Sequence, residues 1–267
     1  MASQLRLGCD VWLSRPKSLA RWIKFARLHR LTDVEIIVDR DEDGTLAAEP
    51  IPPALAAEAR ACAEDAEVRL AVCASVYNFG LGDASPAWAA RCADAVRRAL
   101  EFAVAAGAQR VGVRTDADGG LGQARRRARF AEHAARLGAE ARAAGVVIAL
   151  ENLHDPVPLF VSLLGLEELR GWQVLWNLAH AHAFGGPAGL AAGAGDLFGR
   201  RLCGFSLSDN RGNADDHLAI GRGTVDVRGF LGAVWATRRE LPIFLEIHRG
   251  ADLIASLRTV RRWARSV

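Results

Sequence analysis

The sequence predicts a closed barrel of eight parallel strands surrounded by helices, the (β/α)₈ fold, and three observations support this expectation. Short apolar runs alternate with longer helical patterns along the chain, as they do where helices cover a parallel sheet. There are eight such runs, the number that closes a barrel of this kind. The 267 residues are 51% hydrophobic and contain no linker, so we expect one domain over residues 1–267 with a single large core.

The expected strands are runs of hydrophobic residues without a regular polar alternation. Strands buried on both faces have this pattern, because helices cover one face and the barrel interior fills the other. In chain order the runs occupy residues 5–9, 34–38, 68–74, 110–113, 146–150, 173–176, 202–207 and 243–247.

The expected helices lie between these runs and repeat apolar residues at helical spacing. Pro16, Pro53, Pro86 and Pro187 stand at or near first-turn positions, where the missing amide hydrogen of proline costs nothing. In chain order the helical patterns occupy residues 16–30, 53–64, 86–106, 122–144, 166–169, 187–198, 227–240 and 251–264.

Charge and cysteine content exclude several classes of protein. The formal net charge is +3, so the overall charge does not indicate a nucleic-acid or anionic-membrane partner. The five cysteines include no CxxC pair, which argues against a disulfide framework and against a cysteine zinc site. The first residues lack the apolar core of a signal peptide, and no apolar run reaches membrane-spanning length. We therefore expect a cytoplasmic protein.

Polar side chains follow the expected strands, and the carboxyl ends of such strands carry the chemistry of a barrel. Glu151 and Glu246 each end a continuous apolar run, IALE and IFLE, which places a carboxylate at the inner rim. Arg114 either clamps a phosphate or carboxylate of a small anionic substrate, or pairs with Asp116 or another rim carboxylate. Two loop residues are further candidates for substrate contact: His154 and Arg211.

Motifs in the second half of the chain resemble the xylose-isomerase-like TIM barrels, the sugar phosphate isomerase and epimerase superfamily that also contains enzymes of the endonuclease IV type. After its seventh strand this family has Asp-x-His-Leu-x-x-Gly-x-Gly, and residues 215–223 read DDHLAIGRG, with Asp215 and His217 in register. The remaining matches stand at the ends of strands five, six and eight: EN at 151–152, NLAH at 177–180 and FLE at 244–246.

The resemblance implies a divalent metal held by the two glutamates, an Asp on strand six and a His on strand seven. The chain keeps Glu151 and Glu246 but has Asn177 and Ser206 in the other two places. An amide removes one negative charge from the shell of the ion, and a hydroxyl removes its nitrogen ligand. We therefore expect this site to bind a divalent metal weakly or not at all, with Mg²⁺ and Mn²⁺ left open because they accept amide and hydroxyl oxygens.

The endonuclease IV type implies a second, displaced zinc site. Its ligands match His180, Asp215 and His217, a set that suits zinc or iron, although the same residues could serve only to fix the loop by hydrogen bonds. The histidines that such nucleases need on strands three and four are absent, so a trinuclear zinc nuclease is not expected. The candidate metal ligands are thus Glu151, His180, Asp215, His217 and Glu246.

The leading hypothesis from the resemblance is a sugar isomerase or epimerase that moves a proton next to a carbonyl in a small polyol, keto-sugar or related acid. Glu151 and Glu246 would transfer the proton, while His180 and Asn177 would bind and polarise the substrate. Two alternatives remain open, because this fold hosts many chemistries: a non-catalytic binding or regulatory barrel, and a metal-dependent hydrolase or lyase built on His180, Asp215 and His217. Whether the chain forms a homo-oligomer is also open.

Two basic segments, residues 124–130 and 258–265, place arginines among apolar residues at helical spacing. This pattern usually marks the solvated face of an outer helix, so a nucleic-acid partner is not expected.

Overall fold

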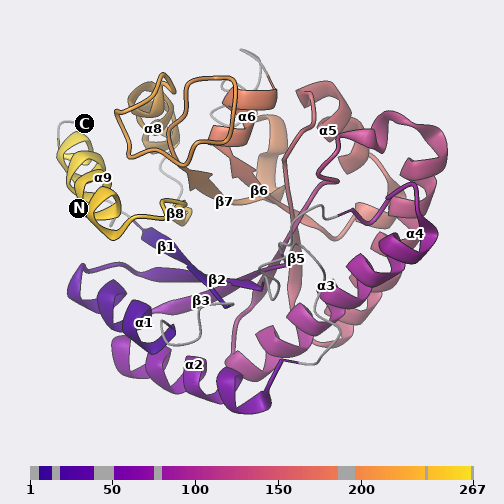
Figure 1. The fold of residues 1–267 in the computed structure, drawn as a ribbon, viewed down its shortest axis with the longest axis horizontal. Coiled ribbons are helices and arrows are strands. Elements are labelled where there is room, and N and C mark those ends of the chain that lie inside the picture. The colour runs from indigo at the N-terminus through magenta and orange to yellow at the C-terminus, as the bar shows by residue number, and fades with distance from the viewer. Residues whose placement is uncertain are drawn as a thin grey trace.

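The computed structural model describes residues 6–13, 19–38, 51–74, 80–185, 196–237 and 240–265. Eight parallel strands close into a barrel in chain order, and β8 pairs back to β1, which confirms the predicted (β/α)₈ TIM barrel. Figure 1 shows the strands in the middle of the molecule. The strands are β1 (Leu7–Trp12), β2 (Asp33–Val38), β3 (Arg69–Ala74), β4 (Arg110–Arg114), β5 (Val147–Glu151), β6 (Gln173–Asn177), β7 (Leu202–Leu207) and β8 (Ile243–Leu245).

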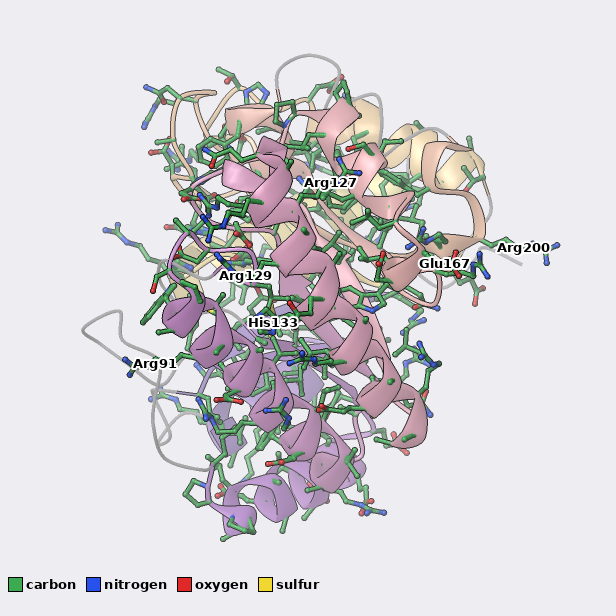
Figure 2. All side chains as sticks on the ribbon, turned by 90° about the vertical axis from the view of Figure 1, so that its right-hand side faces the viewer. Arg91, Arg127, Arg129, His133, Glu167 and Arg200 are labelled. Carbon is green, nitrogen blue, oxygen red and sulfur yellow. The ribbon has the colours of Figure 1, made fainter. Side chains whose placement is uncertain are left out.

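The helices form the outer layer around these strands (Figure 1). Figure 2 looks onto α4, with Arg127, Arg129 and His133 spaced along it. Within the described residues the α-helices are α1 (Leu19–Leu28), α2 (Pro53–Ala66), α3 (Pro86–Ala106), α4 (Ala124–Ala143), α5 (Val157–Leu164), α6 (Leu178–Phe184), α8 (Val227–Ala236) and α9 (Gly250–Ala264). In the part of the chain that the structure describes, three short 3-10 helices accompany them: η2 (Gly120–Gly122), η3 (Glu167–Leu169) and η4 (Asp196–Arg201).

The core follows the predicted pattern of strands buried on both faces. All six residues of β2 are buried. The longest helix, α3, begins as proline chemistry predicts, since Pro86 occupies its first turn and the hydroxyl of Ser85 caps Trp88 N. Pro53 likewise occupies the first turn of α2, which has no side-chain cap, whereas Pro16 and Pro187 lie outside the described residues.

The structure differs from the expected helices mainly between β5 and β7. The expected helix at 166–169 is the 3-10 helix η3, and most of the one expected at 187–198 lies outside the described residues. Two short helices, α5 and α6, were not expected. The run that forms α5 is continuously apolar and short, so its pattern does not distinguish helix from strand. The second, α6, starts directly at the end of β6 without a connecting loop.

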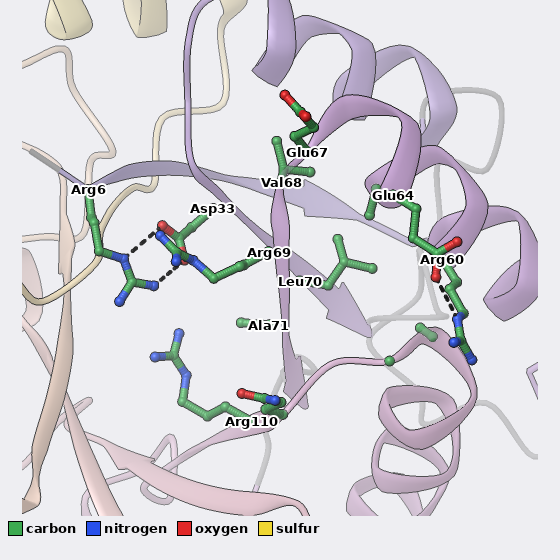
Figure 3. Close-up of a pocket in the computed structure, with 14 residues that line it drawn as sticks. Arg6, Asp33, Arg60, Glu64, Glu67, Val68, Arg69, Leu70, Ala71 and Arg110 are labelled. Atoms are coloured by element: carbon green, nitrogen blue, oxygen red, sulfur yellow. Dashed lines mark hydrogen bonds and ion pairs between the residues drawn. The ribbon is translucent and has the colours of Figure 1, made fainter. Parts of the chain in front are cut away.

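A cavity of about 460 Å³ opens at the amino ends of β1 to β4 (Figure 3). Arg6 and Arg69 both pair with Asp33 there, at 2.5 and 3.4 Å, and Arg110 lines the same cavity. This end of the barrel lies opposite to the strand ends that carry Glu151 and Glu246. The cavity is therefore separate from the candidate active site. Among the described residues, no helix has both the length and the apolar content to cross a membrane.

Candidate active site

Five polar side chains meet at the carboxyl ends of five consecutive strands. Arg114, Glu151 and Asn177 are the last residues of β4, β5 and β6, Ser206 lies near the end of β7, and Glu246 directly follows β8. The strand register places Arg114 beside Glu151, and Asn177 beside Ser206. Residues paired in this way point to the same side of a sheet, so the sequence brings all five side chains to the barrel mouth.

The guanidinium of Arg114 bridges the two glutamates. Its Nε donates to Oε2 of Glu151 at 3.2 Å, and its Nη2 donates to Oε1 of Glu246 at 2.5 Å. Both carboxylates are 1% exposed, so water screens these ion pairs little. Burial acts to raise the pKa of Glu246, but the surrounding positive charges, Arg114 first among them, outweigh it and lower that pKa to about 2. Of the two arrangements left open for Arg114, the structure shows the ion pair, with the two glutamates rather than Asp116 as partners.

Asn177 holds the two glutamates from the side of β6. Its Oδ1 accepts the backbone N–H of His180 at 3.1 Å and so caps α6. Its Nδ2 donates to Oε1 of Glu151 at 2.8 Å and to Oε2 of Glu246 at 3.0 Å. The cap requires an acceptor, which fixes the orientation of the amide and turns its NH₂ group towards the carboxylates.

Two smaller side chains complete the hydrogen bonding of the glutamates. The hydroxyl of Ser206 donates to Oε2 of Glu246 at 3.2 Å. The thiol of Cys73 lies 3.9 Å from Oε2 of Glu151. With Arg114 and Asn177, these groups give each of the four carboxylate oxygens at least one donor.

Two histidines share one carboxylate on the other side of the site. Oδ2 of Asp215 lies 3.0 Å from Nε2 of His180 and 3.1 Å from Nε2 of His217. The Nδ1 atoms of the two rings face the carbonyl oxygens of Asn152 and Glu246, at 2.8 and 3.2 Å. Since carboxylates and carbonyls only accept, each ring is held as a doubly protonated imidazolium.

The pKa shifts in this group agree with that protonation. Burial acts to lower the pKa of His217, but the hydrogen bond to Asp215 outweighs it and raises the pKa to about 9. The pKa of His180 is raised by the same carboxylate against the effect of burial. The two imidazolium rings in turn hold the pKa of Asp215 well below its usual range, although burial opposes them. The site therefore pairs three cationic side chains with three carboxylates.

Asn152 positions this group, a role that the sequence motif alone did not reveal. Its Nδ2 donates to the carbonyl of Asn177 at 2.9 Å, and its Oδ1 accepts the backbone N–H of the same residue at 2.8 Å. Its own carbonyl orients His180. The side chain thus fixes the end of β6 against the end of β5.

The side of the site next to β1 contains residues for which no role was predicted. The ring of His248 lies 4.1 Å from that of His217 and 5.4 Å from that of Trp12. Asp10 is half-buried, and within the described residues its buried Oδ1 has no hydrogen-bond partner. Burial, followed by the nearby carboxylates Glu35, Glu246 and Glu151, raises the pKa of Asp10 well above its usual range. The sequence did place Asp10 and Trp12 at the end of the first expected strand, and this position could have indicated that they border the site.

The two loop candidates lie at different depths. His154 is half-buried, and its ring lies 4.3 Å from that of Phe184. Arg211 is exposed, and its guanidinium lies 3.9 Å from Asp216. Their contact with substrate stays a prediction.

One buried carboxylate organises the loop that carries Asp215 and His217. Asp209 accepts the backbone N–H groups of residues 210, 221, 223 and 225, and its backbone pairs with Leu218 in both directions. Gly223 lies so close that an added Cβ would stand 2.2 Å from a carbonyl oxygen, which explains the glycine there. The loop is therefore closed on itself at its base.

The residues at the centre of the site do not fit a divalent metal as they stand. Glu151, His180 and Glu246 each offer a ligand atom, and these atoms lie within 4.8 Å of one another. However, Asn177 turns hydrogens rather than a lone pair towards the glutamates, and Arg114 places a positive charge between them. A divalent ion needs lone pairs and repels a guanidinium.

Comparison with known proteins assigns this chain to a family. The family model described as the xylose isomerase-like TIM barrel matches residues 24–267. The chain belongs to this family. No functionally curated protein matches it.

Solved structures share the fold of this xylose isomerase-like barrel at low sequence identity. A D-tagatose 3-epimerase-like protein has a TM-score of 0.78 and 17% identity, with 98% of both chains covered. The 3-keto-D-glucoside 4-epimerase of E. coli has a TM-score of 0.73 and 15% identity, with 99% of this chain and 100% of that chain covered. Endonuclease IV from Thermus thermophilus has a TM-score of 0.73 and 21% identity, with 98% and 100% covered. At these identities the likeness concerns the fold alone.

The basic segment 124–130 of this barrel corrects one expectation. It forms the start of α4, but Arg126 is 7% exposed and donates to Asp116 at 3.1 Å, so it is not part of a solvated face. Arg127 and Arg129 donate to Ser162 and to the carbonyl of Asp83. Arg126 thus neutralises the buried Asp116 that follows β4, while Arg127 and Arg129 bind neighbouring segments of the fold.

Proposed function

We propose that this protein is a sugar isomerase or epimerase that moves a proton on the carbon next to a carbonyl. The observation that carries the proposal is the pair of buried carboxylates, Glu151 and Glu246, held at the barrel mouth by one guanidinium. Two of its structural neighbours are described as sugar epimerases or epimerase-like proteins, which supports the substrate class.

In this proposal one glutamate takes the proton from the carbon as a carboxylate, and the other first takes up a proton from solvent and then donates it to the substrate. An epimerase returns the proton to the opposite face of the same carbon, and an isomerase returns it to the neighbouring carbon. Negative charge then develops on the carbonyl oxygen, as in an enediolate. Arg114 uses Nε and Nη2 on the glutamates, and we assign its Nη1 group to this oxygen, with His180 and His217 as nearby positive charges.

The charge balance of the site favours an uncharged substrate. Three cations already face three carboxylates, so the phosphate or carboxylate that Arg114 alone suggested has no unpaired guanidinium to meet at this position. We therefore favour an unphosphorylated keto-sugar over a sugar phosphate. We propose one catalytic barrel domain that acts in the cytoplasm without a nucleic-acid partner.

The test is proton exchange with solvent, which detects the chemistry even without net conversion. The protein is incubated in D₂O with a panel of keto-sugars, phosphorylated and unphosphorylated, and deuterium at the carbon next to the carbonyl is followed by NMR. Glu151→Gln and Glu246→Gln should each lower the exchange rate by about 10²–10⁴-fold, because a positioned acid or base contributes this much.

Glu167→Gln is the matched control, since this glutamate is exposed and pairs only with a neighbour on the surface. It should exchange at the rate of the unaltered protein. Retained exchange in both active-site variants would refute the proposed function. Tight sugar binding without exchange would indicate the non-catalytic barrel, and a metal-dependent hydrolysis lost in His217→Ala would indicate the hydrolase or lyase.

A further inference from the structure

The position of Arg114 goes beyond the assignment of two proton-transferring glutamates. Its guanidinium contacts both carboxylates, and these carboxylates, with His180, are the residues whose ligand atoms lie within 4.8 Å of one another. We infer that the Arg114 guanidinium is the resident cation of this site and takes the place of a divalent metal ion. The catalytic half of this inference rests on the proposed function, whereas the half that concerns metal binding does not.

The direction of the hydrogen bonds supports this inference. An aspartate at position 177 could cap α6 with one oxygen and offer a lone pair of the other to a metal. The asparagine present caps with its oxygen and so must offer hydrogens. Amide hydrogens suit carboxylates that are already neutralised by a guanidinium, and they oppose a bound metal.

Ser206 fits the same arrangement. Its hydroxyl donates to Oε2 of Glu246, on the same oxygen that accepts from Asn177. With Arg114 on Oε1, Glu246 receives three side-chain donors among the described residues. Three residues on three strands, β4, β6 and β7, therefore present hydrogens to the same pair of glutamates. Charge-assisted hydrogen bonds of this kind are the stronger class in proteins.

A guanidinium also suits the proposed chemistry. It is planar, it keeps its charge throughout the physiological pH range, and it presents donors in a fixed fork. One edge of the fork holds the two acids apart, and the remaining donors face the oxygen on which charge develops. A metal would provide the same stabilisation through a single point charge.

The first experiment measures metal binding by the unaltered full-length protein, and it does not require activity. Mn²⁺ is titrated into the protein and free Mn²⁺ is read by electron paramagnetic resonance, with Zn²⁺ in a parallel calorimetric titration. We expect no stoichiometric binding of either ion. One equivalent bound by the protein and lost in Glu246→Gln would overturn the inference.

The second experiment restores the metal ligands with and without the arginine. Asn177→Asp/Ser206→His retains Arg114, and Arg114→Met/Asn177→Asp/Ser206→His removes it. If Arg114 occupies the place of the ion, the triple variant should bind one Mn²⁺ about 100-fold more tightly than the double variant. Equal affinities would overturn the inference. If the triple variant is only marginally folded without Mn²⁺, the melting temperatures of both variants are measured at increasing Mn²⁺, and that of the triple variant should rise more.

The third experiment concerns catalysis. Exchange by the unaltered protein should persist after treatment with EDTA, and Arg114→Met should lower it by about 10²–10³-fold, as expected for loss of an oxyanion donor. Added guanidinium chloride at millimolar concentration should restore part of that rate, and Arg114→Lys should not, since a lysine cannot bridge both acids. Exchange abolished by EDTA would overturn the inference and leave the proposed function intact. Failure to exchange with any sugar would reject the function, while the metal titrations would still decide the inference.

Discussion

Two arginines at opposite ends of β4, Arg110 and Arg114, show how differently one residue type can behave in a barrel. Both side chains lie on the same face of the strand, because they are four residues apart, and both are 13% exposed. Arg114 donates to two carboxylates. Arg110 packs over the ring of Phe244 at 5.0 Å and lies 3.5 Å from Glu35, and within the described residues its Nε and Nη2 donate no hydrogen bond.

The carboxylates respond in opposite ways. Burial raises the pKa of Glu35 to about 7, although Arg110 acts to lower it. At the other end, the cations lower the pKa of Glu246 to about 2 against the effect of burial. Equal burial and an adjacent arginine therefore do not decide the charge of a carboxylate. The number of nearby cations decides it, since Arg114, His217 and His180 together outweigh burial at Glu246, whereas Arg110 and Arg114 do not outweigh burial at Glu35.

The largest expected difference between the two ends of β4 is the change in the free energy of unfolding when each arginine is replaced. Arg114→Met should lower the free energy of unfolding by about 3–5 kcal/mol, because it leaves two buried carboxylates without a partner. Arg110→Met should cost about 1–2 kcal/mol, since Glu35 can take up a proton instead. Urea unfolding at pH 7 measures both. Equal losses would show that the two ends are energetically alike, and proton exchange by Arg110→Met should stay at the level of the unaltered protein.

The next effect is a pH dependence of opposite sign at the two ends. The folded-state pKa of Glu35 is raised, so its contribution to stability is present below about pH 4.5 and is lost as the pH rises to about 7. Glu35→Gln should therefore stabilise the protein at pH 8 by up to about 3 kcal/mol and change little at pH 4.5. Glu246→Gln should destabilise it at neutral pH, because a lowered pKa contributes stability above about pH 4.5 that is lost towards pH 2.

Urea unfolding at several pH values between 4 and 8 tests this expectation. A Glu35→Gln variant that loses stability at pH 8 would show that its carboxylate, like that of Glu246, is stabilised by its arginine.

The smallest effect concerns Gly112, which separates the two arginines on the same face of β4. An added Cβ would stand 3.5 Å from Sγ of Cys73, an ordinary contact distance. Gly112→Ala should therefore change the free energy of unfolding by less than about 1 kcal/mol and leave exchange unaltered. Thermal unfolding measures this. A large loss of stability or activity would show that the two ends are coupled through the strand between them.

The sequence predicted the barrel and the positions of the glutamates, because a continuous apolar run that ends in a carboxylate defines both the strand and its rim. It did not predict the direction of the Asn177 amide, since that depends on α6 beginning directly at the end of β6. Nor could it pair Arg114 with Glu246, which lies 132 residues away. The burial of Arg126 was missed for the same reason, because its partners are defined by contacts between elements rather than by spacing along α4.

The hydrogen bonds that Asp209 accepts from four backbone N–H groups have a consequence for protein engineering. This carboxylate accepts the backbone N–H groups of residues 210, 221, 223 and 225, and the backbone of Asp209 pairs with that of Leu218. The two ends of the segment from 211 to 217 are therefore held close together by hydrogen bonds outside the segment. Its length and composition can be varied in a library while the barrel beneath it keeps its shape. Selection for a new sugar would best begin with this segment, provided that Asp209, Asp215, His217 and Gly223 are left unchanged.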